Sequence, residues 1–237
     1  MSRSFKTALQ AFTVNFLCSA VLISVSLSLV LIWFFPYPFI AVDDISTPLL
    51  MIIGVNLCIG PLLTLILYKP DKKGLLFDLS IVAILQIAAL IYGLYAVYDS
   101  RPVYLVFYGD SFYLTDHKQV DQSALQDDGL AIGAWDRPKI VASVLLGDTQ
   151  QRMLLAFESM ASGQPLSMNA AYFVSTNTLE PSEWLLLALN PKQFKNIPKK
   201  YRDNPRYAFF HVVSAKNGLI AVFDTEKLAI THIFTDK

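Results

Sequence analysis

Histidine is the side chain best suited to metal binding and to acid–base chemistry near neutral pH, and this sequence contains three histidines. His117 lies in a polar segment, whereas His211 and His232 lie in different predicted strands. These two could meet across a sheet, but ordinary strand positions are the simpler interpretation. The stretch 100–237 has no cysteine, no HxxxH or HExxH pair, and no G-x-S-x-G, Walker or G-x-G-x-x-G motif. We therefore expect no catalytic, cofactor-binding or metal-binding residues.

An acid inside an apolar stretch is informative because its charge is costly in a membrane. Asp78 follows the start of one such stretch and lies two helical turns from Lys72 and Lys73. The simpler interpretation is a carboxylate that reaches the membrane surface or pairs with a lysine. A coupling or proton-transfer role is the alternative.

Small residues form two stripes that would let helices approach closely. One stripe has the spacing i, i+3, i+7, i+10 and begins with the hydrogen-bonding Gln86, and the other repeats every four residues. The members are Gln86, Ala89, Gly93 and Ala96 in the first stripe, and Ala20, Ser24 and Ser28 in the second. These faces either pack the protein's own helices together or dock a helix of another protein.

Three apolar runs carry these residues: 12–35, 48–68 and 76–98. Each has roughly 21 to 24 residues, which is enough to cross a bilayer core of about 30 Å. The first run is longer than the core of a signal peptide and ends in the aromatic stretch Trp33–Pro38 rather than in a cleavage site. We therefore expect three retained transmembrane helices, with a kink at Gly60-Pro61 in the second.

Basic residues near these runs predict the orientation. They are Arg3, Lys6, Lys69, Lys72 and Lys73, whereas the first loop, 36–47, has no Lys or Arg. The positive-inside rule places the N-terminus and the second loop in the cytoplasm. The predicted domains are a three-span anchor, 1–99, and an extracytoplasmic domain, 100–237, which would be periplasmic in a Gram-negative bacterium.

The composition argues against a nucleic-acid-binding protein and against a protein held together by disulfide bonds. Apolar residues make up 54% and charged residues 16% of the sequence, against the roughly 25% charged residues of soluble proteins. The net charge is zero, so there is no basic field for a nucleic-acid partner. Cys18 and Cys58 both lie inside apolar runs, so we expect no disulfide framework.

The stretch 100–237 predicts a small α+β domain with antiparallel strands. Strands are expected at 103–107, 111–115, 207–214, 219–223 and 228–234, and helices at 148–161 and 183–189. Residues 116–132 read as loop. Asn217-Gly218 between two strands is typical of a type I′ hairpin.

One stretch of this chain resembles a known family. It consists of Tyr68-Lys69-Pro70, Leu76-Phe77-Asp78-Leu79, Gln86, Ala89-Leu90, Tyr92-Gly93, Tyr95 and Arg101–Phe107. These residues, and the order of three spans before a soluble domain, are similar to the TfpX/TfpZ type IV pilin accessory proteins, most closely over residues 50–107. The resemblance implies a multi-pass protein of the bacterial inner membrane that assists assembly of its cognate major pilin, and so surface display and twitching motility. Its partners would be that pilin or other pilus assembly components, and the family brings no catalytic motif or cofactor.

The sequence leaves two alternatives to a non-enzymatic assembly factor. A membrane-tethered sensor would bind a ligand through its outer domain, but only short loops face the cytoplasm to carry an output. A pilin-modifying membrane enzyme would need ionisable groups near the outer interface. Only Asp43, Asp44, Asp99 and Arg101 qualify there.

Overall fold

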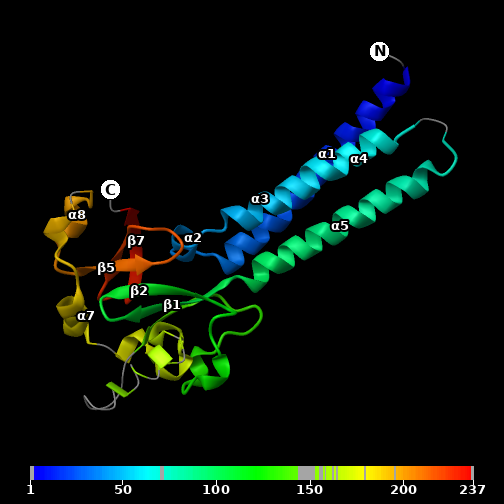
Figure 1. Cartoon of the computed structure of the whole chain (residues 1–237). Coiled ribbons are helices and arrows are strands. Elements are labelled where there is room, and N and C mark those ends of the chain that lie inside the picture. Colours follow the sequence, from blue (N-terminus) through cyan, green and yellow to red (C-terminus); the bar gives the residue numbers. More distant parts are fainter. Residues whose placement is uncertain are drawn as a thin grey trace. The chain divides into compact units, whose positions relative to one another are not determined.

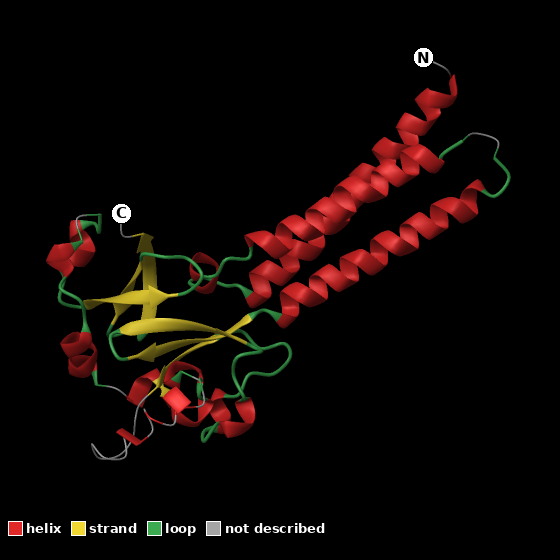
Figure 2. Ribbon diagram, in the orientation of Figure 1, coloured by secondary structure: helices red, strands yellow, loops and turns green. Residues whose placement is uncertain are grey.

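The computed structural model describes residues 3–69, 72–143, 153–154, 157, 159–161, 163, 165–178, 180–194 and 196–235 (Figure 1). The chain divides into a helical unit, Met1–Trp33 with Ile45–Asp99, and a sheet unit, Phe34–Asp44 with Ser100–Lys237. The predicted fold class, three apolar helices plus a small α+β domain, is confirmed (Figure 2).

Each predicted apolar run is helical. The first is α1 (Arg3–Phe34), and the third is α5 (Leu75–Asp99). The second, Ser46–Leu67, consists of α3 (Ser46–Gly54), η1 (Val55–Ile59) and α4 (Gly60–Leu67). The shortest of the three has 22 residues, which at 1.5 Å rise per residue matches the thickness of a bilayer core.

A π-helical segment lies directly before Gly60-Pro61, where the sequence predicts a kink. Pro61 is the second residue of α4, and η1 is the π-helix immediately before it. A proline lacks the N–H that would bond one turn back, and its ring crowds the carbonyl group there. A wider π turn accommodates both effects without ending the helix.

The loop after α1 folds with the sheet unit rather than with the helices. Its short helix α2 (Phe39–Val42) buries Phe39 and Val42 in the core of the sheet unit. The Lys216 Nζ donates to the carbonyl oxygens of Ile40 and Ala41 at 3.4 and 3.2 Å. The sequence suggested a boundary at residue 99 alone, because the aromatic residues of this loop were attributed to the membrane interface.

Among the described residues, seven strands form one mixed sheet in the order β4-β3-β1-β2-β5-β6-β7. They are β1 (Pro102–Tyr108), β2 (Ser111–Asp116), β3 (Lys139–Ser143), β4 (Phe173–Ser175), β5 (Tyr207–Val213), β6 (Leu219–Asp224) and β7 (Ala229–Thr235). The predicted hairpin β1–β2 and the antiparallel order β5–β6–β7 are confirmed. The pairs β1–β3 and β2–β5 are parallel, and the sequence did not predict β3 or β4.

The turn between β5 and β6 differs from the prediction. Val212 pairs with Leu219, so the connection is a loop of several residues rather than a two-residue turn. Gly218 has a φ of +67° but Asn217 does not have a positive φ, whereas a type I′ turn requires both. The type I′ assignment was therefore wrong.

Aromatic residues from the sheet and its covering segments form the core. Trp184 in α7 (Pro181–Leu187) is fully buried, with ring centroids 4.3 Å from Phe223 and 4.4 Å from Phe107. Apolar residues of the same strands that point the other way, such as Phe209 and Val222, pack under Tyr201 of α8 (Lys199–Arg202). The sheet is thus covered on both faces, which explains why β1 and β6 are buried almost throughout.

Short helical turns connect the strands. They are η2 (Gln122–Ala124), η3 (Asp128–Leu130), η4 (Leu166–Met168), η5 (Ala170–Tyr172), η6 (Thr176–Thr178) and η7 (Pro191–Gln193). The predicted helix 183–189 is observed as α7, starting two residues earlier. The predicted helix 148–161 lies largely outside the described residues.

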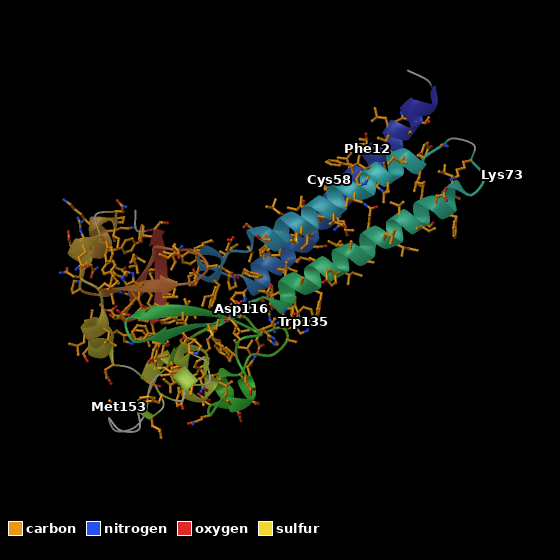
Figure 3. All side chains as sticks on the ribbon, in the orientation of Figure 1. Phe12, Cys58, Lys73, Asp116, Trp135 and Met153 are labelled. Carbon is orange, nitrogen blue, oxygen red and sulfur yellow. The ribbon has the colours of Figure 1, made fainter. Side chains whose placement is uncertain are left out.

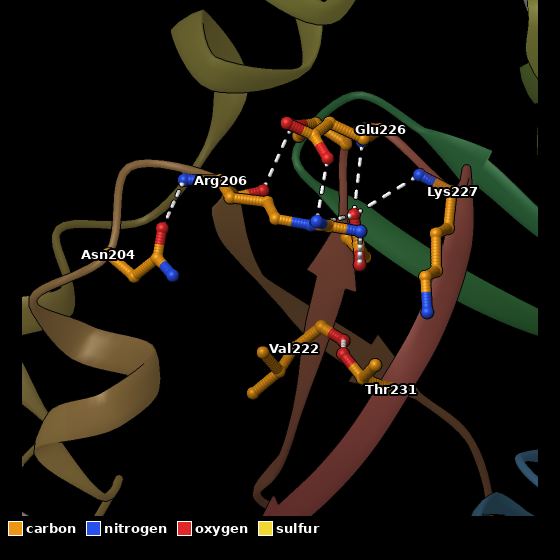
Figure 4. A network of polar contacts seen from close by, with 8 residues as sticks. Asn204, Arg206, Val222, Glu226, Lys227 and Thr231 are labelled. Atoms are coloured by element: carbon orange, nitrogen blue, oxygen red, sulfur yellow. Dashed lines mark hydrogen bonds and ion pairs between the residues drawn. The ribbon is translucent and has the colours of Figure 1, made fainter.

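Arg206, which directly precedes β5, forms ion pairs with acids at and just after the end of β6 (Figure 4). Its Nε and Nη2 bond to the two carboxylate oxygens of Asp224 at 2.8 and 2.7 Å, and its Nη1 lies 2.7 Å from Glu226. The backbone N–H groups of Glu226 and Lys227 also donate to Asp224 Oδ1. Burial raises the pKa of Asp224, but these hydrogen bonds outweigh burial and hold that pKa below its usual range.

Candidate functional site

Gln86 lies where α5 meets both other spans of the helical unit. Its side-chain amide exchanges two hydrogen bonds with the amide of Asn15 on α1, each 3.2 Å long. Gln86 Nε2 also lies 3.0 Å from Ser19 Oγ and 3.4 Å from the Asn56 carbonyl oxygen. One side chain therefore links all three helices.

The remaining polar groups of this network satisfy one another. Asn15 Nδ2 donates to Thr64 Oγ1 at 3.0 Å, and Thr64 donates in turn to the carbonyl oxygen of Gly60. Asn56 Nδ2 donates to the carbonyl oxygen of Ile52. Lipid offers no hydrogen-bonding partners, so such a saturated network stabilises one arrangement of the helices. The network is thus a contact between the protein's own helices.

Two glycines allow α5 to approach the second span. A Cβ at Gly60 would overlap the Gln86 side-chain amide, and a Cβ at Gly93 would lie 2.5 Å from Ile52 Cγ1. Gln86 and Gly93 from the first stripe are therefore contact positions within the helical unit.

The other side of the first stripe is open. Ala89, Gly93 and Ala96 line a groove of about 500 Å³ between α5 and the second span. Its other lining residues are Pro48, Leu50, Met51, Ile52, Gly54, Val55, Asn56, Ile59 and Tyr92. The lining is almost wholly apolar, and Tyr92, Leu50 and Met51 expose 75%, 69% and 66% of their surface. A groove of this kind accepts an apolar helix or lipid chains.

The second stripe does not meet the first. On α1 the buried apolar residues are Ala8, Ile23, Leu27 and Phe34, whereas Ser24 and Ser28 are exposed and Ala20 is half-buried. Ser19, adjacent to Ala20, makes the contact with Gln86 instead. Cys18 and Cys58 are both exposed on the helical unit, where Figure 3 labels Cys58.

Asp78 forms an ion pair with Lys72, six residues earlier. The carboxylate exposes 25% of its surface and the lysine 41%. This is the lysine pairing that the sequence offered as the simpler interpretation.

The sheet unit brings together two acids that the sequence did not connect. Burial, and next the nearby carboxylate of Asp43, together raise the pKa of Asp116 to about 6, although Lys118 opposes the shift. Burial also raises the pKa of Asp43, against the Asp44 backbone N–H and Lys216. Asp43 Oδ2 is buried and accepts no hydrogen bond among the described residues. The partners are far apart in sequence, so no local pattern could predict the pair.

The three histidines are dispersed. His211 in β5 pairs with Ile220 of β6, and His232 in β7 pairs with Val222 of β6. The strand β6 therefore lies between the two histidines, and they do not meet. The His232 Nδ1 lies 2.8 Å from the Tyr201 hydroxyl oxygen. Within the described part of the chain, no three His, Cys, Asp or Glu side chains are placed to hold a metal ion.

The three apolar helices, with an amide network between them, fit a membrane protein, and the chain adds a mixed-sheet domain to them. A fimbrial assembly protein of serogroups C1 and C2 from Dichelobacter nodosus is 35% identical over 100 residues, which cover 41% of this chain and 76% of that relative. The chain therefore belongs to the family of fimbrial assembly proteins.

Two further relatives carry the same name. The fimbrial assembly proteins of Dichelobacter nodosus serogroups I and E1 are 34% and 36% identical over 96 and 100 residues. These matches cover 40% and 41% of this chain but only 37% and 39% of the relatives. No protein-family model and no solved structure matches the chain.

Proposed function

We propose that this protein is an inner-membrane factor that assists assembly and surface display of a cognate type IV major pilin. The similarity to three fimbrial assembly proteins carries the proposal. The resemblance of residues 50–107 to TfpX/TfpZ pilin accessory proteins supports the finer assignment to a pilin-specific role in pilus biogenesis and twitching motility.

The apolar groove between α5 and the second span is the proposed contact site. A pilin before assembly is held in the membrane by one apolar helix, and a helix in an apolar groove is a common mode of recognition. Ala89, Gly93 and Ala96 let a helix backbone come close. The protein would act by binding rather than by catalysis.

The proposed orientation has the N-terminus in the cytoplasm and residues 100–237 in the periplasm. One support is the excess of lysine between the second and third spans. The other is that residues 34–44 pack in the sheet unit, so this loop and residues 100–237 must lie on the same side of the membrane. An alkaline phosphatase reporter fused after Lys237 should be active, and one fused after Lys72 inactive. The opposite pattern would overturn the orientation.

Filling the groove tests the pilin contact. Ala96→Leu places a larger side chain on the exposed wall of the groove, and should abolish co-purification of pilin and surface pili at normal protein abundance. Ala88→Leu is the matched control, because Ala88 is exposed on the same helix but does not line the groove. Gly93→Leu is unsuited, since it would displace Ile52 within the helical unit. Equal effects of the two alanine variants would refute the groove as the contact.

A further inference from the structure

Trp135 is an exposed aromatic residue held in a rigid position. It exposes 74% of its surface, although the sheet unit buries most of its other aromatic residues. The Asp136 N–H donates to the Gly133 carbonyl oxygen at 3.3 Å, so Ala134 and Trp135 occupy the centre of a tight turn. The Gly133 N–H donates to Asp136 Oδ2 at 2.9 Å. This second hydrogen bond across the turn also occupies the Asp136 carboxylate.

The flanks of the turn are fixed as well. Ile132 is buried in the core, and its N–H donates to Gln122 Oε1 at 2.7 Å. Lys139 Nζ bonds to the carbonyl oxygens of Gly129 and Ala131 at 2.9 and 2.8 Å. The turn therefore presents Trp135 in one place rather than on a loose loop.

That place is the end of a transmembrane helix. The Trp135 ring packs on Phe34, with centroids 6.1 Å apart and planes inclined by 32°. Phe34 is the last residue of α1 and of its apolar run, Thr7–Phe34. The residue that ends such a run lies at the edge of the hydrocarbon core, so a side chain in contact with it lies at the level of the lipid headgroups.

The chemistry of the surroundings fits this level. Tryptophan prefers the membrane interface because its ring is apolar and its indole N–H requires a polar partner. Arg137, two residues after Trp135, is exposed. An exposed cation beside the tryptophan matches the phosphate groups of lipids.

We infer that the turn Gly133–Asp136 is a membrane-interface anchor that inserts Trp135 among the lipid headgroups and so seats the sheet unit on the bilayer surface. Figure 3 labels Trp135. The inference needs only that α1 crosses the membrane, and it is independent of any pilin.

Fluorescence quenching of the full-length protein in liposomes tests the anchor. Trp33→Phe leaves Trp135 and Trp184 as emitters, and Trp184 is fully buried in the core. Its emission serves as an internal report that the variant is folded. The double variant Trp33→Phe, Trp135→Phe gives the signal of Trp184 alone, to be subtracted.

The Trp135 contribution should lose most of its intensity in liposomes of phospholipid brominated near the ester groups, and should resist iodide in the surrounding water. Quenching by iodide without quenching by brominated lipid would place Trp135 in water and overturn the inference. Resistance to both quenchers would show a protein surface covering Trp135, and would overturn it equally.

Discussion

Asn15 and Gln86, 71 residues apart in the sequence, exchange two side-chain hydrogen bonds of 3.2 Å inside the apolar helices. A reciprocal amide pair requires both side chains at one height and facing one another. It therefore fixes the rotation and the register of α1 against α5. Ser19, Asn56 and Thr64 then tie the pair to the rest of the helical unit.

Removing either amide should loosen the helical unit. Gln86→Ala and Asn15→Ala should each lower the free energy of unfolding by about 1 kcal/mol, as for other hydrogen bonds between membrane helices. The double variant should cost less than the sum of the two, because both lose the same pair of bonds. Unfolding by SDS in mixed micelles measures the difference. Thr13→Ala is the control, since Thr13 bonds to its own helix at the Leu9 carbonyl oxygen. Additive costs would show that the two amides act independently.

Gly60 should tolerate no side chain while Gln86 is present. Gly60→Ala should destabilise the protein by about 1–3 kcal/mol, the usual cost of overpacking, because its Cβ would overlap the Gln86 amide. Gly54→Ala, in the same span, should be neutral or stabilising, since no atom lies within 4 Å of a Cβ there. Adding Gln86→Ala to Gly60→Ala should recover part of the loss. If both glycine variants behaved alike in the same SDS assay, the contact between Gly60 and Gln86 would be refuted.

Arg206 should be more important for stability than the exposed acid beside it. Arg206→Ala leaves the buried carboxylate of Asp224 without its cation, so it should lower the free energy of unfolding by clearly more than the loss of an exposed ion pair does. Glu226→Gln removes only an exposed partner and should cost less than about 1 kcal/mol. Thermal unfolding followed by the emission of buried Trp184 reports on this unit. Similar losses in the two variants would contradict the asymmetry.

Stability of the sheet unit should fall as pH rises through about 6. Burial, and next the charge of Asp43, raise the pKa of Asp116 to about 6 in the folded protein, above roughly 3.9 in the unfolded chain. The folded state therefore binds the proton more tightly, so this contribution is complete below about pH 4 and is lost as pH rises through about 6. Asp116→Asn should unfold at a higher temperature than the natural protein at pH 7, and at a similar temperature near pH 4.

Asp43→Asn provides the companion measurement. It removes the charge that helps to raise the pKa of Asp116, so the pH dependence should weaken and shift to lower pH. An Asp116→Asn protein whose melting temperature kept the full pH dependence of the natural protein would contradict this account.

The sequence predicted the elements that hydrophobic periodicity determines. The three apolar helices, the β1–β2 hairpin and the strands β5, β6 and β7 were all expected, because each is defined by a local pattern. The strand β4 was missed because it has only three residues. β3 was missed because it pairs in parallel with β1, and such a pair is not joined by a tight turn that could be recognised in the sequence.

The site was predicted less completely. Gln86 stood out as a polar residue in an apolar helix, but its partner Asn15 read only as an interruption of the first run. The spacing of residues on one helix face could not show which of them contact the protein's own helices and which line an open groove. In the structure Gln86 and Gly93 make internal contacts, and Ala96 lines the groove. Residues 34–44 fold with the sheet unit because Phe39 and Val42 pack against residues that are distant in the sequence. An aromatic stretch next to a membrane span is equally typical of a membrane interface, so the sequence did not predict this packing.

Cysteine crosslinking between the groove and the pilin tests the central claim most directly. The background carries Cys18→Ser and Cys58→Ser, because both cysteines are exposed. Ala96→Cys lines the groove, whereas Ile91→Cys is an exposed position on α5 outside it. With single cysteines placed along the apolar helix of the pilin, Ala96→Cys should give adducts that recur with helical periodicity, and Ile91→Cys should give none. Adducts absent from Ala96→Cys, or equal at the two positions, would contradict a pilin helix in this groove.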